Sequence, residues 1–345
     1  MDKSNTHFFL NIPVLGICGW SGAGKTTLIE SIVRNQTALG RKICVIKHDA
    51  HQIQVDREGK DSFRFFYSGA DVVVTNADEF FFRGHHGDHW AVHRIIRSLA
   101  PRYDGFLVEG HKHSRLPRKI WLRHPEKLDV PEVTQGFEDV IERSNAALEK
   151  VSALFESILS ECWQRSPVSG AVLIGGESSR FGEAKHLAKS GDRTWVERIV
   201  DAMAPHLSSI VLIGRGKVPE SLSTLLRLPD VPGVAGPIAG IRAAFRWNPG
   251  TSWIVAPCDV PQLHGDAIAW LLNQRAIGRD AVLPVLDEDG PVEPLPAFYD
   301  YRCGPFFEEM DSPRRIADVA RVCCPVVPPP LRESWHNVNS LRDRD

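Results

Sequence analysis

Ala171-Val-Leu-Ile-Gly-Gly-Glu-Ser-Ser-Arg-Phe-Gly-Glu-Ala-Lys185 is the stretch that decides the fold of the C-terminal half of this chain. Its four apolar residues, 171–174, predict a short buried strand, and the two glycines that follow let the backbone turn closely beside a ligand. Arg180 and Lys185 are two cations that could close over a polyphosphate from a loop. This order favours a nucleoside triphosphate held at the carboxyl edge of a sheet. A plain strand–turn–helix connection with incidental surface charge is the alternative.

A second glycine-rich stretch lies near the start of the chain, Gly19-Trp-Ser-Gly-Ala-Gly-Lys-Thr-Thr27. It fits the pattern G-x-x-x-x-G-K-[ST], between an apolar run at 14–18 and an apolar helical pattern at 28–33, which is the setting of a phosphate-binding P-loop. Lys25 would reach the β- and γ-phosphates, and the Thr26 hydroxyl would hold Mg²⁺. The predicted nucleotide contacts of this loop are Gly19, Gly22, Ala23, Gly24, Lys25, Thr26 and Thr27.

Two acidic residues compete as a further ligand of that Mg²⁺. Glu109 ends a strand predicted over 104–109, whereas Asp49 follows a strand predicted over 42–46. Asp is the usual residue in this role, but Asp49 could also be a loop carboxylate that caps a turn. No N-K-x-D stretch occurs, so the sequence does not predict which base this domain prefers.

Asp259 has the most constrained setting of the acids in the second half. It lies in Pro257-Cys-Asp-Val-Pro261, directly after an apolar strand predicted over 253–256. Two prolines fix the local backbone direction, as a metal ligand requires. The alternative is that Asp259 is the N-cap of a helix that begins near Gln262.

Length and composition predict two globular domains. The chain has 345 residues, of which 43% are apolar and 24% charged, and its net charge of −2 does not favour nucleic acid as a partner. Seven scattered cysteines without C-x-x-C spacing favour a reducing cytoplasm, and no apolar stretch approaches the roughly 18 residues that cross a membrane. Apolar residues at helical spacing over 137–162 predict one long helix, and 164–170 reads as a short linker. We therefore expect domains over 1–165 and 166–345.

Histidines gather in two places of the first domain. His85, His86, His89 and His93 form one group, in which His89 and His93 would share a helix face as metal ligands can, unless the group is a solvated loop that leads into a surface helix. His111 and His113 flank Lys112 just after Glu109, where they could contact a phosphate or a pterin.

The motifs of the first domain resemble, in the same order, those of the adaptor (B) protein of molybdopterin-guanine dinucleotide biosynthesis. The matching pieces are Gly19–Leu28, Ile46-Lys-His48, Val55-Asp56, Gly59-Lys-Asp-Ser62, Ser68-Gly-Ala70, Leu107-Val-Glu-Gly110 and Lys112-His113. The resemblance covers residues 13 to about 123 and implies a P-loop domain that binds GTP, hydrolyses it weakly and associates with a guanylyltransferase.

The second domain resembles the molybdenum cofactor guanylyltransferase, the A protein of the same pathway. The matching pieces are Leu173-Ile-Gly-Gly176 with Ser178, Arg180, Gly182 and Lys185, then Gly236–Gly240, Cys258-Asp259 with Pro261, Pro294-Leu295, and Asn337-Val-Asn339. The resemblance implies that Asp259 holds Mg²⁺ and that GTP contacts Leu173, Ile174, Gly175, Gly176, Lys185 and Asp230. Three residues depart from the family pattern: Ala184 replaces an acid, Ile174 replaces alanine, and Gly214 stands where an asparagine contact is typical.

Together the two resemblances imply a bifunctional protein of molybdenum cofactor biosynthesis, in which GMP passes from GTP to Mo-molybdopterin and pyrophosphate leaves. Arg180, Lys185 and Asp259 are then the expected catalytic residues, Mg²⁺ is the cofactor, and GTP and molybdopterin are the substrates. Molybdopterin insertion proteins and apo-molybdoenzymes are the expected protein partners. A cytidylyltransferase for the same pterin is one alternative, and a non-catalytic protein that delivers the cofactor is another. The expected fold is two three-layer α/β/α domains, a P-loop NTPase domain and a Rossmann-like nucleotidyltransferase domain.

Overall fold

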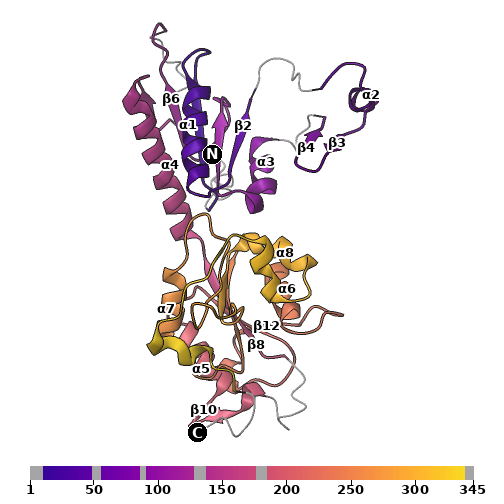
Figure 1. Cartoon of the computed structure of the whole chain (residues 1–345), viewed down its shortest axis with the longest axis vertical. Helices are drawn as coiled ribbons and strands as arrows, with labels where there is room; N and C mark the ends of the chain where they lie inside the picture. Colours follow the sequence, from indigo (N-terminus) through magenta and orange to yellow (C-terminus); the bar gives the residue numbers. More distant parts are fainter. Residues whose placement is uncertain (1–10, 49–55, 86–90, 128–136, 176–184, 339–345) are drawn as a thin grey trace. The chain divides into compact units, whose positions relative to one another are not determined.

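The chain divides into two compact units, an N-terminal unit over Met1–Gln164 and a C-terminal unit over Arg165–Asp345 (Figure 1). The computed structural model describes residues 11–48, 56–85, 91–127, 137–175 and 185–338. Each unit has its own sheet and core, and we describe each by itself.

The N-terminal unit is built on a parallel sheet of five strands in the order β2-β5-β1-β6-β7. These strands are β1 (Val14–Gly19), β2 (Ile43–Lys47), β5 (Gly105–Glu109), β6 (Lys119–Leu122) and β7 (Asp139–Ile141). Parallel strands need crossover connections, and a parallel sheet is covered on both faces. All of their carboxyl ends therefore meet at one edge, where the P-loop leaves β1.

Helices cover both faces of this sheet, as Figure 1 shows: α1 (Lys25–Ala38) and α4 (Asn145–Arg165) lie on one face and α3 (Val92–Leu99) on the other. The alternation along β5 explains the arrangement. Phe106 packs in one apolar cluster with Ile96 of α3, whereas a Cβ on Gly105 would meet Phe155 of α4 at 2.9 Å. The three-layer α/β/α fold predicted for this domain is confirmed.

The long helix predicted over 137–162 is wrong at its start. Val140 and Ile141 belong to β7, which pairs in parallel with β6, and α4 begins only at Asn145. Two adjacent apolar residues satisfy a strand and a helix equally well, so their spacing alone could not separate the two. The linker predicted over 164–170 is also wrong, because α4 continues to Arg165 and the next strand begins at Val168. Strand β6 was not predicted.

A small antiparallel hairpin stands outside the five-stranded sheet. It consists of β3 (Val72–Thr75) and β4 (Phe80–Arg83), with α2 (Asp61–Tyr67) against β3. Arg83 ties these pieces together, because its guanidinium lies 3.2 Å from Asp56 and 3.8 Å from the centre of the Phe66 ring. Several large apolar side chains of α2 and the hairpin are exposed: Phe65, Tyr67, Val73, Val74, Phe80 and Phe82.

The C-terminal unit is built on a mixed sheet of seven strands in the order β12-β11-β8-β13-β15-β14-β16. Strands β12, β11, β8 and β13 run parallel, and β15 pairs antiparallel with β13 and β14. The bounds are β8 (Val168–Leu173), β11 (Ile210–Ile213), β12 (Leu226–Leu228), β13 (Ser252–Pro257), β14 (Ala281–Val282), β15 (Ala297–Tyr299) and β16 (Val322–Cys323). The chain goes from β8 to β11 and β12 on one side, then crosses to β13 on the other. In open α/β sheets such a switch point is where ligands bind, outside the carboxyl ends of the strands.

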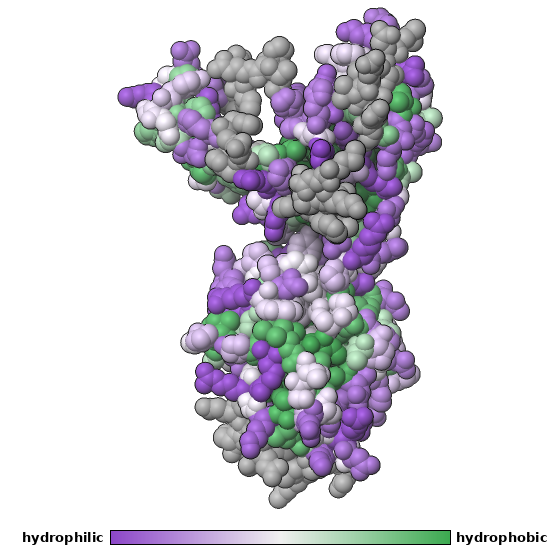
Figure 2. Space-filling model, turned by 180° about the vertical axis from the view of Figure 1, so that it is seen from behind, coloured by the Kyte–Doolittle hydropathy of each residue, from purple (hydrophilic) through white to green (hydrophobic). Residues whose placement is uncertain are grey.

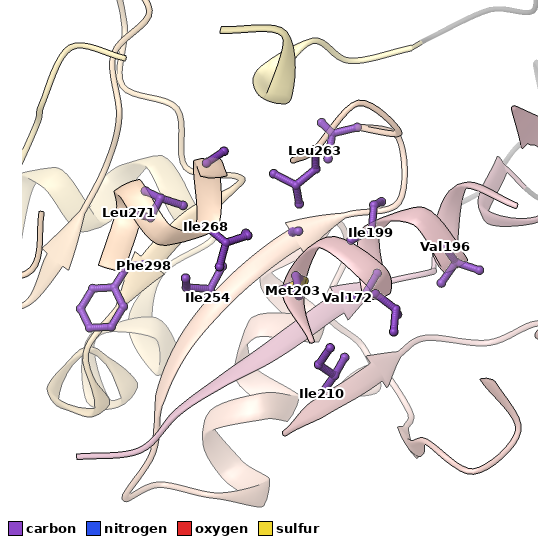
Figure 3. Packing of buried hydrophobic residues seen from close by; sticks show 14 of the residues in the cluster. Val172, Val196, Ile199, Met203, Ile210, Ile254, Leu263, Ile268, Leu271 and Phe298 are labelled. Atoms are coloured by element: carbon purple, nitrogen blue, oxygen red, sulfur yellow. The ribbon is translucent and has the colours of Figure 1, made fainter. Parts of the chain in front are cut away.

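Two apolar clusters sandwich this sheet. In one, shown in Figure 3, Val172 and Ile254 pack with residues of α5 (Trp195–Met203) and α7 (Gly265–Asn273). In the other, Ala171 and Val255 pack with α6 (Pro237–Trp247), α8 (Gly304–Glu309) and α9 (Ile316–Val319). Adjacent residues of one strand thus face opposite clusters, and the predicted three-layer nucleotidyltransferase fold is confirmed.

Short elements complete the two units. They are the strands β9 (Lys189–Ser190) and β10 (Arg193–Thr194) and the 3₁₀ turns η4 (Ala100–Arg102), η6 (Lys185–Leu187), η7 (Glu220–Leu222), η8 (Tyr301–Cys303), η9 (Pro313–Arg315) and η10 (Pro329–Trp335). Hydrophilic side chains make up much of the surface in the view of Figure 2, and an apolar area lies on the C-terminal unit. None of the helices in the described ranges has the length and apolar character to span a membrane.

Glu197 closes a capping box at the start of α5. Its carboxylate accepts from the Thr194 main-chain N–H at 2.8 Å, and the Thr194 hydroxyl accepts from the Glu197 N–H. Hydrogen bonds from Ser221 and then from Thr194 lower the pKa of Glu197 from 4.5 to about 2. Because this pKa is depressed on folding, the stabilisation is present above pH 4.5 and is lost as the pH falls toward 2.

Glu197→Gln should therefore destabilise the C-terminal unit by about 1 kcal/mol or more at neutral pH, as the loss of a cap does. The loss in free energy of unfolding relative to the wild-type protein should be smaller near pH 3, where protonation has removed much of the stabilisation that the wild-type carboxylate provides. Urea titrations of both proteins at the two pH values measure this. An equal loss in free energy of unfolding at both pH values would show that the charge of Glu197 does not contribute to stability.

Candidate functional site

One cavity of about 340 Å³ lies at the switch point of the C-terminal sheet. Its walls come from the carboxyl ends of three strands: Leu173 ends β8 and Ile174 and Gly175 follow it, Asp230 follows β12, and Cys258 and Asp259 follow β13. Lys185 and His186 of η6 and the start of α6 complete it. The chain thus brings together five of the predicted GTP contacts and Asp259, the predicted Mg²⁺ ligand, and their sequence separation shows that only the fold assembles them. Gly176 and Arg180, also predicted here, lie outside the described residues.

Lys185 and Asp259 face each other across the cavity. The ammonium Nζ lies 3.5 Å from a carboxylate oxygen of Asp259, and both side chains are about one-quarter exposed. The interpretation of Asp259 as a helix N-cap is wrong, because α7 begins at Gly265 and its N-cap is His264. The main-chain carbonyl of Asp259 instead accepts from Val338 N–H at 2.8 Å. The Asn337–Asn339 piece is therefore tied to the metal-ligand candidate, although Asn339 itself lies outside the described residues.

Asp230 sits against two glycines that have no room for a side chain. A Cβ on Gly175 would lie 2.7 Å from an Asp230 carboxylate oxygen, and a Cβ on Gly240 would lie 3.4 Å from the other. Burial raises the pKa of the Asp230 carboxyl, and the charge of Arg215 partly offsets this. A half-buried carboxylate in a cavity wall offers acceptors for donor groups of a ligand.

Gly214 is a departure from the family pattern that the structure explains. Its φ is +122°, and a Cβ there would meet the main-chain nitrogen of Gly175 at 2.4 Å. No side chain can occupy this position with the backbone as it stands. Residue 214 can contact a nucleotide only through its main chain.

Sequence reasoning missed two parts of this cavity. His186 is buried, and its Nε2 lies 2.8 Å from the Lys217 carbonyl, so it anchors the residue next to Lys185. The segment Gly236–Gly240 was predicted only as a matching piece of the family resemblance, with no role in the site assigned to it. Helix α6 begins at Pro237 and its first turn lines the cavity, where the N-terminal end of the helix dipole favours an anion. Pro at the first helical position was the available signal.

Cys258 also lines the cavity, and its surroundings disfavour the thiolate. Burial, together with the charge of the adjacent Asp259, raises the pKa of its thiol to about 12. The thiol therefore stays protonated near neutral pH.

The N-terminal unit carries the second predicted site, the loop between β1 and α1. Gly24 precedes the helix with φ +92°, a conformation that favours glycine, and the main-chain N–H groups of the first helical turn point into the loop. The Lys25 ammonium donates to the Trp20 carbonyl at 2.9 Å and to the Gly19 carbonyl at 3.1 Å. The lysine therefore lies over the mouth of the loop, where phosphates would bind.

Thr26 and Glu109 meet beside this loop. The Thr26 hydroxyl lies 3.4 Å from both oxygens of Glu109, because β5 is the neighbour of β1 and Glu109 is in register with Ile17. Asp49, the rival ligand, lies outside the described residues. A hydroxyl and a carboxylate at the edge of a phosphate loop form a donor set that Mg²⁺ accepts.

The histidines lie in different surroundings. His111, which has φ +52°, stands 4.7 Å from His48 between ring centres, and burial together with His48 lowers its pKa. His85 pairs with Asp71 at 3.5 Å, and His93 lies in α3. His86 and His89 lie outside the described residues, and among those that are described no three His, Cys, Asp or Glu side chains are grouped to hold a metal. His111 and His113 as ligand contacts remain a prediction.

Comparison with known proteins matches the two halves separately. Residues 14–141 match the family described as "Molybdopterin guanine dinucleotide synthesis protein B", and residues 170–325 match the "MobA-like NTP transferase domain". A probable molybdenum cofactor guanylyltransferase of Bacillus mycoides (strain KBAB4) is 34% identical over 142 residues, which is 40% of this chain and 70% of that protein. The chain belongs to the molybdenum cofactor guanylyltransferase family.

More specifically, this guanylyltransferase family member carries a protein B domain ahead of its transferase domain, so the expected fusion is confirmed. Two solved structures are similar to one half each. Molybdopterin-guanine dinucleotide biosynthesis protein A from Archaeoglobus fulgidus is 26% identical and covers 51% of this chain and 94% of its own, with a TM-score of 0.43. MobB of Bacillus subtilis is 23% identical and covers 41% of this chain and 97% of its own, with a TM-score of 0.33.

Proposed function

We propose that the C-terminal unit transfers GMP from GTP to Mo-molybdopterin, which yields molybdopterin guanine dinucleotide and pyrophosphate. The observation that carries this proposal is the cavity in which Lys185, Asp259 and Asp230 converge at the switch point of the sheet. The 34% identity to a probable molybdenum cofactor guanylyltransferase supports the choice of nucleotide and pterin.

The reaction requires little of the protein beyond alignment and neutralisation of charge. The terminal phosphate of the pterin attacks the α-phosphorus of GTP in line, a new P–O bond forms, and the bond to the departing pyrophosphate breaks. Because the attacking phosphate is already ionised, no general base is needed. Lys185 and the N-terminus of α6 supply positive potential within the cavity, and Arg180 is proposed to share this role.

Asp259 is the residue that we propose holds Mg²⁺ in this cavity. The fit rests on the donor set: a single directed, half-buried carboxylate at a phosphate site suits Mg²⁺, which commonly binds one or two carboxylates together with substrate phosphates. When bound, the ion would neutralise phosphate charge. Lys185 must then leave Asp259 for a phosphate oxygen, which the 3.5 Å contact at the cavity surface permits.

We propose that the N-terminal unit binds GTP and hydrolyses it slowly, as an adaptor for the transferase. The geometry that supports this is Lys25 over the loop mouth and the pair of Thr26 and Glu109, which would hold Mg²⁺ beside the terminal phosphates. Asp49 is proposed as a further candidate ligand. Molybdopterin insertion proteins and apo-molybdoenzymes are the proposed protein partners, and the cytoplasm is the proposed location.

A competition assay tests the nucleotide. With purified protein, molybdopterin and Mg²⁺, we expect GTP to support release of pyrophosphate. CTP should inhibit this release only weakly. Preference for CTP would favour a cytidylyltransferase. Absence of release with either nucleotide would favour a delivery protein that binds the pterin without catalysis.

Gly175→Ala probes the cavity wall directly. The new Cβ would lie 2.7 Å from the Asp230 carboxylate, so either Asp230 or the loop must shift. We expect kcat/KM for GTP in the transfer assay to fall about 10- to 100-fold, as displacement of a binding site by about 1 Å does. Gly250→Ala is the matched control, because its Cβ would meet no atom nearer than 4.0 Å. Equal kcat/KM values for both variants would show that Asp230 is not part of the GTP site.

A further inference from the structure

A second cavity, also of about 340 Å³, lies beside the first turns of α1 in the N-terminal unit. Gly24, Thr27, Leu28 and Ser31 line it from the P-loop and α1. Leu122 at the end of β6, Arg143 and Ser144 after β7, and Ala147 and Leu148 of α4 form the opposite wall. Its volume lies within the range of ordinary small-molecule pockets, about 300–1,000 Å³. Gly24 and Thr27 belong to the predicted phosphate-binding loop, but no role has been assigned to the opposite wall of this cavity.

The sheet order places the cavity and the proposed metal site on opposite sides of the P-loop. Strand β5, which ends in Glu109, is the neighbour of β1 on one side, and β6 and β7 follow on the other. Thr26 lies against Glu109, whereas Thr27, one residue farther around the helix, lines the cavity. A nucleotide with its terminal phosphates near Thr26 and Glu109 would therefore extend its sugar and base past Thr27 into this cavity.

The lining suits a planar base with one polar edge. Leu28, Leu122, Ala147 and Leu148 give apolar walls, and the polar side chains opposite α1 are those of Arg143 and Ser144. The Arg143 Nε lies 3.2 Å from the position that a Cβ on Gly24 would take, so the guanidinium reaches over the loop. Within the described part of the chain, no hydrogen bond or ion pair holds this guanidinium.

We propose that this cavity is the base pocket of the P-loop site and that Arg143 selects guanine there; the proposal rests on the proposed binding of GTP by the P-loop. A guanidinium can only donate hydrogen bonds. Guanine presents two neighbouring acceptors, O6 and N7, which an arginine can engage together, whereas adenine presents a donor at N6 beside N7. The sequence has no N-K-x-D stretch from which a base preference could be predicted, and Arg143 in this cavity would provide a preference for guanine.

Photolabelling of the full chain with 8-azidoguanosine triphosphate locates the base, because the azide lies next to N7. We expect label on peptides from either wall of the cavity, residues 24–31 or 122–148, and its loss in Lys25→Ala. Peptide mapping by mass spectrometry separates this label from any on the C-terminal unit. Label elsewhere in the N-terminal unit would overturn the pocket but leave GTP binding by the P-loop intact. No label anywhere in that unit would overturn both proposals.

Competition for this label tests the role of Arg143. GTP and inosine triphosphate, which share O6 and N7, should compete equally well, and ATP and 2-aminopurine riboside triphosphate should compete on the order of 10- to 100-fold less well. Arg143→Met should abolish this difference, and Arg34→Met, a matched exposed arginine on α1, should retain it. If Arg143→Met instead weakened all four competitors by the same factor, the arginine would contact phosphate and the proposed selection of guanine would be wrong.

Discussion

Replacing Asp259 by alanine should lower the turnover number of GMP transfer at least about 10²-fold, as the loss of one preorganised charge partner does in other active sites. Asp259 is the proposed ligand of Mg²⁺ in the cavity, and its carboxylate lies 3.5 Å from the Lys185 ammonium. The variant frees Lys185 from its acidic partner, so the affinity for GTP itself should not fall. The expected signature is thus a loss in kcat with KM for GTP unchanged or lower, measured by pyrophosphate release at saturating molybdopterin.

Two further variants make this result specific. Asp259→Asn keeps the shape of the side chain and removes its charge, so it should be nearly as inactive as the alanine variant. Asp266→Ala removes an exposed acid from the first turn of α7 and should keep full activity. Near-wild-type turnover of Asp259→Ala would reject Asp259 as the metal ligand.

Lys25→Ala should abolish GTP hydrolysis by the N-terminal unit and leave transfer by the C-terminal unit largely intact. The Lys25 ammonium now donates to the Trp20 and Gly19 carbonyls at the mouth of the P-loop, where it can turn to the β- and γ-phosphates. Alanine removes that cation while the glycines still shape the loop. Phosphate release from GTP without pterin measures hydrolysis, and pyrophosphate release with pterin measures transfer.

Lys42→Ala is the control for this variant, because Lys42 lies just before β2, at the opposite edge of the sheet from the P-loop. It should keep both activities. Loss of transfer as well as hydrolysis in Lys25→Ala would show that the two sites are coupled. Unchanged hydrolysis in Lys25→Ala would show that the P-loop is not the site of hydrolysis.

The sequence predicted the parts of both sites that depend on local chemistry. The strand–loop–helix around Gly24 and Lys25 and the glycines after β8 could be recognised because each motif is continuous in the chain. Asp259 could be singled out because two prolines and an apolar strand surround it. In each case neighbouring residues determine the backbone, so a single stretch contained the information.

What could not be predicted depends on residues far apart in the chain. Edge strand β7 was read as helix because Val140 and Ile141 fit both periods, and only its pairing with β6 separates them. His186 carries no motif, and its role beside Lys185 follows from a contact with Lys217. Arg143 likewise stands in no motif, and only the parallel order of β1, β6 and β7 brings it over Gly24.

Product identification tests the central claim most directly. The purified chain is incubated with Mo-molybdopterin, Mg²⁺ and equal amounts of GTP and CTP labelled at the α-phosphate, and the pterin products are identified by mass spectrometry. We predict that the wild-type protein forms labelled molybdopterin guanine dinucleotide and that the Asp259→Ala variant forms none. A cytosine dinucleotide, or unmodified pterin bound to the protein, would contradict the account.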